Sequence, residues 1–82
     1  MSDVGHDLHA LFPGDGEVLH WLKEQSAHFR TLAAKHHDLG KEIHRIEAGI
    51  EAAAHDRLEA LKRDRVVLLD QIAALIATKR AA

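Results

Sequence analysis

The chain has 82 residues, a formal charge of −2 and no cysteine. This length allows one small domain, and the lack of cysteine excludes disulfides, thiolate metal ligands and thiol nucleophiles. No apolar segment approaches the ~18–20 residues of a membrane-spanning helix, and the first residues lack the basic and apolar regions of a signal peptide. We therefore expect a single cytoplasmic domain over residues 1–82.

The first fifteen residues form a head in which we expect a short helical turn. Leu8, Leu11 and Phe12 have the spacing i, i+3, i+4, which places three apolar side chains on one face of a helix. Pro13 disfavours helical geometry at the residue before it, so this turn should end there. The Gly-Asp-Gly that follows is typical of a turn, and Asp15 can cap the next helix.

A long first helix is expected over residues 16–49. Its apolar side chains recur in steps of three and four, as in a heptad repeat. Such a narrow stripe is stable only when it packs against another helix. The stripe consists of Leu22, Phe29, Leu32, His36, Leu39, Ile43 and Ile46.

A turn over residues 50–55 and a second helix over residues 56–79 complete the chain. Gly49 suits a left-handed helix end, and the pattern Asp-Arg-Leu-Glu at the start of the second helix resembles a capping box. The alanine-rich tract between them favours a helix, so one continuous helix over residues 17–79 is an alternative. The stripe of the second helix consists of Leu58, Leu61, Arg65, Leu68, Leu69, Ile72, Leu75 and Ile76.

These elements predict an all-α fold, an antiparallel two-helix coiled-coil hairpin with a short N-terminal helical turn. Folding the second helix back on the first would pair Ile43 with Leu61. The second helix carries more apolar surface than a two-helix contact covers, and Leu19 and Trp21 add to it. We therefore expect two hairpins to form a homodimeric four-helix bundle.

Charge is distributed unevenly along the chain. Residues 1–24 contain five acids and one base, a net charge of −4, whereas residues 57–82 contain six bases and three acids, a net charge of +3. In a chain that folds back on itself, the acidic start lies beside the basic end. We therefore expect these charges to neutralise each other, and binding of nucleic acid by the basic second helix is the weaker alternative.

Histidine is unusually frequent, at positions His6, His9, His20, His28, His36, His37, His44 and His55. A helical metal site uses ligands at i, i+3 or i, i+4, and among the histidines only His6 and His9 have this spacing. We expect exposed imidazoles and neither a metal nor a cofactor, with a metal-binding or pH-sensing protein as an alternative. His36 lies in the stripe opposite Arg65, so either both polar tips reach solvent or His36 is a pH-sensitive lock on helix register.

The sequence contains no pattern typical of an active site. There is no glycine-rich phosphate loop, no nucleophile with a base and no carboxylate pair placed across an apolar cleft. We expect a protein that is not an enzyme, with no catalytic or cofactor-binding residues. The candidate surface for a protein partner consists of Leu8, Leu11, Phe12 and Trp21.

Several short motifs occur in a characteristic order. They are His6-Asp7-Leu8, Leu11-Phe12-Pro13, Leu22-Lys23, His28-Phe29, Glu42-Ile43-His44-Arg45-Ile46-Glu47, the segment 58–65 and the segment 68–72. Over residues 6–76 the chain thereby resembles the YdcH-like family of small bacterial proteins, also named domain of unknown function 465. The resemblance implies a helical coiled-coil hairpin and no established activity. A structural or protein-interaction module is therefore the function that we expect.

Overall fold

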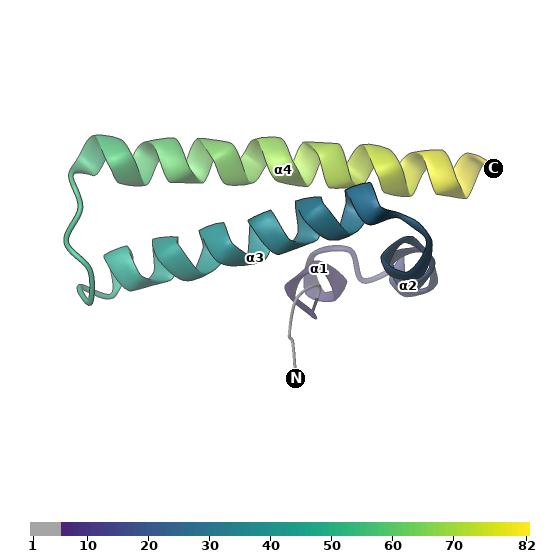
Figure 1. The fold of residues 1–82 in the computed structure, drawn as a ribbon, viewed down its shortest axis with the longest axis horizontal. Coiled ribbons are helices and arrows are strands. Elements are labelled where there is room, and N and C mark those ends of the chain that lie inside the picture. Colours follow the sequence, from purple (N-terminus) through teal and green to yellow (C-terminus); the bar gives the residue numbers. More distant parts are fainter. Residues whose placement is uncertain (1–5) are drawn as a thin grey trace.

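A computed structural model describes residues 6–82, which form four helices and contain no strand. The helices are α1 (His6–Leu11), α2 (Gly16–Gln25), α3 (Ala27–Glu47) and α4 (His55–Ala81). The two long helices α3 and α4 lie side by side, and α4 returns along α3 (Figure 1). The short helices α1 and α2 lie at the end where α3 begins and α4 finishes (Figure 1). The predicted all-α fold with two long packed helices is confirmed.

The predicted single helix over residues 16–49 is wrong, because the helix is broken at Ser26. The backbone of Ser26 is extended, with φ −125° and ψ 108°. Its hydroxyl accepts a hydrogen bond from the backbone N–H of Phe29 at 3.0 Å, which satisfies one of the free amides at the start of α3. The apolar periodicity runs through this position, so the heptad pattern alone gives no sign of the break.

A side chain from the first turn of α3 completes the corner at Ser26. The guanidinium Nη1 of Arg30 donates to the backbone carbonyl oxygens of Lys23 at 2.8 Å and Glu24 at 3.3 Å. These carbonyls lie in the last turn of α2, where helical partners are missing. The end of α2 is thus bound to the start of α3, and the two helices diverge at a fixed corner.

The connection between α3 and α4 occupies residues 48–54, which are not helical, so the alternative of one helix over residues 17–79 is wrong. Gly49 has φ +77°, the left-handed conformation expected for it, which a residue with a Cβ rarely adopts. The predicted capping box is also wrong, because α4 begins at His55 and its N-cap is Ala54, without a side-chain cap. Asp56 lies inside the first turn, where its charge still favours the helix.

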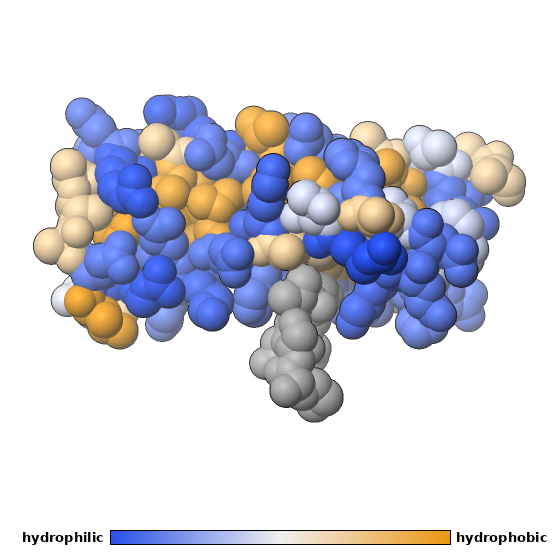
Figure 2. Space-filling model, viewed as in Figure 1, coloured by the Kyte–Doolittle hydropathy of each residue, from blue (hydrophilic) through white to orange (hydrophobic). Residues whose placement is uncertain are grey.

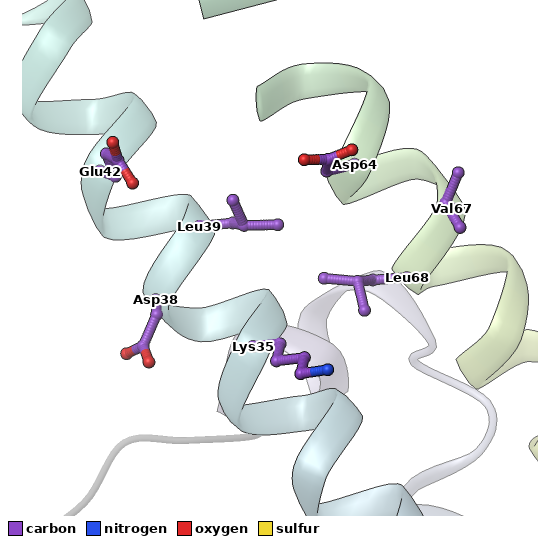
Figure 3. Close-up of a pocket in the computed structure, with 7 residues that line it drawn as sticks. All are labelled: Lys35, Asp38, Leu39, Glu42, Asp64, Val67 and Leu68. Carbon is purple, nitrogen blue, oxygen red and sulfur yellow. The ribbon is translucent and has the colours of Figure 1, made fainter. Parts of the chain in front are cut away.

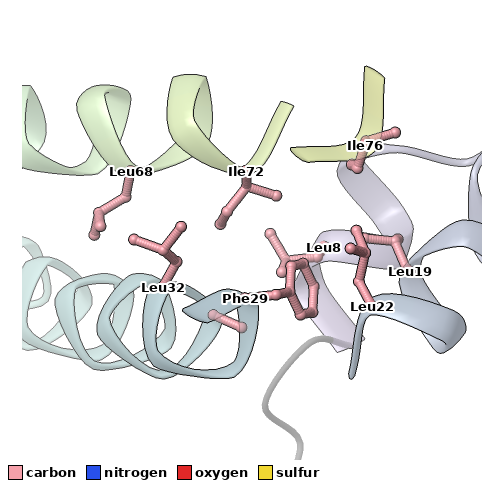
Figure 4. Close-up of a cluster of buried hydrophobic side chains, with 9 residues drawn as sticks. Leu8, Leu19, Leu22, Phe29, Leu32, Leu68, Ile72 and Ile76 are labelled. Atoms are coloured by element: carbon pink, nitrogen blue, oxygen red, sulfur yellow. The ribbon is translucent and has the colours of Figure 1, made fainter. Parts of the chain in front are cut away.

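The main core lies where all four helices meet (Figure 4). Leu8 of α1 and Ile72 of α4 are fully buried there. We call this cluster the four-helix core, and it consists of Leu8, Leu19, Leu22, Phe29, Leu32, Ala33, Leu68, Ile72 and Ile76. Every stripe residue named above is buried or half-buried. Leu19, which the sequence suggested would need a second hairpin to cover it, is instead buried within the chain.

We expect Ser26→Ala to lower the free energy of unfolding by about 1 kcal/mol, because the Phe29 amide loses its cap. Thr31→Ala is the matched control, since the Thr31 hydroxyl only donates to the Ala27 carbonyl inside α3. This control should change stability by less than about 0.5 kcal/mol. Urea denaturation followed by circular dichroism measures both variants. Equal effects would contradict a capping role for Ser26.

Candidate interaction surfaces

Two ion pairs join α3 and α4 near the connection between them. Glu42 and Glu47 near the end of α3 contact Arg57 and Lys62 of α4, and the Glu47–Lys62 pair measures 3.0 Å between Oε2 and Nζ. Because these side chains are partly exposed, each pair contributes no more than about 1 kcal/mol. They fix how α3 and α4 lie against each other beside the connection.

At the opposite end, the basic end of the chain contacts its acidic start. Arg80 Nε lies 3.4 Å from Asp15 Oδ1, and Lys79 Nζ lies 4.1 Å from the centre of the Trp21 ring. The second contact is a cation–π interaction, worth about 0.5–1 kcal/mol at an exposed site. The Asp15–Arg80 contact places one acid of the start beside the basic end of the chain. Asp15 lies at the N-cap position of α2, but its side chain makes no capping hydrogen bond, so the cap predicted from the sequence is wrong.

His36 is buried against α1. The sequence placed it opposite Arg65 of the second long helix, but the charged group that it approaches is the carboxylate of Asp7 in α1. His36 is 4 % exposed, and its Nδ1 lies 2.9 Å from Asp7 Oδ2. That distance is short enough for an ion pair, but the carboxylate oxygen does not lie along the direction in which an Nδ1–H group would point. Neither ring nitrogen therefore has a hydrogen-bond partner among residues 6–82. The prediction that the tip of His36 reaches solvent is wrong.

The other histidines are not brought together in the described part of the chain. No group of three or more histidine, aspartate or glutamate side chains there is placed to hold a metal ion. His20 contacts Glu24 one turn later in α2, at 2.6 Å on an exposed surface. The predicted pair of His6 and His9 cannot be placed, because the side chain of His6 lies outside the described residues.

The four residues of the predicted partner surface do not form one exposed patch, because two are exposed and two are buried or half-buried. Leu8 is 0 % exposed and belongs to the four-helix core, so it is not a surface residue. Phe12 packs half-buried against the same core. Leu11 and Trp21 are 52 % and 43 % exposed, and Trp21 also carries Lys79. The spacing of Leu8, Leu11 and Phe12 predicted one apolar face, but α1 turns only part of it toward the core.

An open groove of about 460 Å³ lies between α3 and α4, next to the four-helix core. In Figure 3, Leu39 of α3 and Leu68 of α4 point toward each other across it. We call this the α3–α4 groove, and its lining consists of Lys35, Asp38, Leu39, Glu42, Asp64, Val67 and Leu68. The groove thus has an apolar floor with charged residues around it. The sequence periodicity placed Leu39 and Leu68 in the contact between the helices and did not predict that they line a groove.

One edge of α4, beside the α3–α4 groove, also carries exposed apolar surface. Val66 and Val67 are 56 % and 55 % exposed. Figure 2 shows apolar residues at this edge, midway along α4, with hydrophilic residues around them. Neither valine belongs to the heptad stripe, which is why periodicity left them without a role. Within residues 6–82, no helix is both long enough and apolar enough to cross a membrane.

The model of the family described as "Protein of unknown function (DUF465)" matches residues 29–76, more than half of the chain. This chain belongs to that family. The matched segment contains most of α3 and α4 and every residue that lines the α3–α4 groove, whereas α1 and α2 precede it. No curated protein matches the chain, and no solved structure matches it.

We expect His36→Leu to raise the free energy of unfolding by about 1 kcal/mol, because it removes two buried nitrogens that have no hydrogen bonds. The apolar side chain would pack in the same place beside α1. Urea denaturation at pH 8 measures the change. A clear loss of stability would show instead that the approach of Asp7 to the imidazole holds α1 in place, and Asp7→Asn should then lose as much.

Proposed function

We propose that this protein is a cytoplasmic, non-enzymatic interaction module that self-associates as a homodimeric bundle of four long helices. The observation that supports this most directly is uncovered apolar surface on the long helix pair. Val66 and Val67 are more than half exposed on α4, next to the open α3–α4 groove. Adjacent apolar side chains on a helix surface are typical of a contact with another helix.

The lining of the α3–α4 groove supports contact over catalysis. Its floor is formed by Leu39, Val67 and Leu68, and one of its carboxylates, Glu42, is bound to Arg57. A groove of this kind accepts an apolar side chain from a partner protein and offers no nucleophile with a base. The groove is therefore the second surface through which we propose that the module binds a partner.

The charges of α4 favour a protein partner over nucleic acid. Arg57, Lys62 and Arg80 are paired with acids of the same chain, and Lys79 lies over Trp21. Phosphate binding requires cations that are free to replace counterions along the nucleic-acid backbone. Since most cations of α4 already have contacts within the chain, the basic composition of this helix is a weak argument for DNA or RNA binding.

Self-association is tested by multi-angle light scattering during size-exclusion chromatography over a range of loading concentrations. The expected mass is about twice the chain mass of 9.1 kDa, with dissociation on dilution. A mass of one chain at every concentration would contradict the homodimer.

A further inference from the structure

Four residues of α4 form one exposed face with a regular order of charge. Arg63, Val66, Val67 and Asp70 are spaced i, i+3, i+4, i+7, so they share one face of the helix, and all four are exposed. We call this the outer face of α4. Along the chain it reads basic, apolar, apolar, acidic.

The two charges of the outer face have no partners within the described part of the chain. Arg63 and Asp70 belong to none of the ion pairs among residues 6–82. Seven residues of helix separate them by about 10 Å along the axis, and no ion pair joins them. The outer face therefore has a cation and an anion available for a partner, with two exposed valines between them.

We infer that a second copy of the chain covers this face, with the two α4 helices antiparallel about a two-fold axis between Val66 and Val67. This inference rests on the proposed homodimer and names its contact. An antiparallel two-fold arrangement reverses the order of the partner, so Arg63 meets the partner's Asp70 and Asp70 meets the partner's Arg63. The valines of the two copies meet at the centre.

The charge order also selects the direction of the partner helix. A parallel arrangement in register would place Arg63 beside the partner's Arg63 and Asp70 beside the partner's Asp70, and like charges at a helix contact oppose association. Ala74 and Ala77 continue the exposed face toward the end of α4. In the two-fold pair, the alanines of one copy lie to one side of the valines and those of the partner lie to the other. Their small side chains let the two helices approach closely there.

Charge reversal tests the contact. R63E alone and D70K alone each place like charges together at two positions, so we expect each variant to dimerise at least about tenfold more weakly than the unmodified chain. An equimolar mixture of R63E and D70K should form a heterodimer. In it, the introduced glutamate of one copy meets the introduced lysine of the other, and the two unchanged charges still form an opposite pair. The mixture should regain an affinity close to that of the unmodified chain.

The controls are K41E on α3 and E17K on α2, which make the same charge changes at exposed positions outside both the outer face of α4 and the α3–α4 groove. They should leave the dimer affinity unchanged. Sedimentation equilibrium measures each affinity, and circular dichroism checks that every variant is folded. Recovery on mixing cannot come from misfolded chains, because it requires two intact helices.

The outcomes separate the contact from the function. If the unmodified chain dimerises but neither reversal weakens it, or if the controls weaken it instead, the dimer exists and the outer face of α4 is not its contact. If the reversals weaken the dimer but the mixture does not recover, the antiparallel pairing is wrong. If the unmodified chain is monomeric throughout, both the inference and the proposed homodimer fail.

Discussion

The fold depends on one constraint, the burial of apolar side chains from four helices at one end of the long helix pair. Leu8 from α1 reaches the same cluster as Phe29 from α3 and Ile72 from α4. Two helices alone bury a single stripe and leave its flanks in water, which gives a small domain little stability. The helices α1 and α2 pack against the long helix pair and add buried apolar side chains to this cluster.

The same arrangement leaves the other half of the helix pair less covered. Beyond the four-helix core, Ile43 and Leu61 are buried between α3 and α4. An open groove lies between the same helices, and Leu68, at the edge of the core, lines it together with Leu39. Two ion pairs, formed by Glu42 and Glu47 with bases of α4, lie near this half and hold the helices together at its end. The molecule thus has a closed end that stabilises it and an open end that offers surface.

The sequence predicts the long helices well, and the N-terminal third poorly, for physical reasons. Heptad spacing identifies which residues of α3 and α4 are buried, because burial in a helix pair follows the period of the helix. It cannot show the break at Ser26, since a capped break keeps the apolar period. It also cannot show that Leu8 joins Ile72, from a distant part of the chain, in one core. Serine three residues before Phe29 was the one local sign of the corner.

The most direct measurement of the role of the head compares two leucines of α1. Leu8 is 0 % exposed and Leu11 is 52 % exposed on the same short helix. Leu8→Ala should lower the free energy of unfolding by about 2–5 kcal/mol, as for a fully buried leucine, and Leu11→Ala by less than about 0.5 kcal/mol. Small and equal losses in chemical denaturation would contradict the central role of the four-helix core.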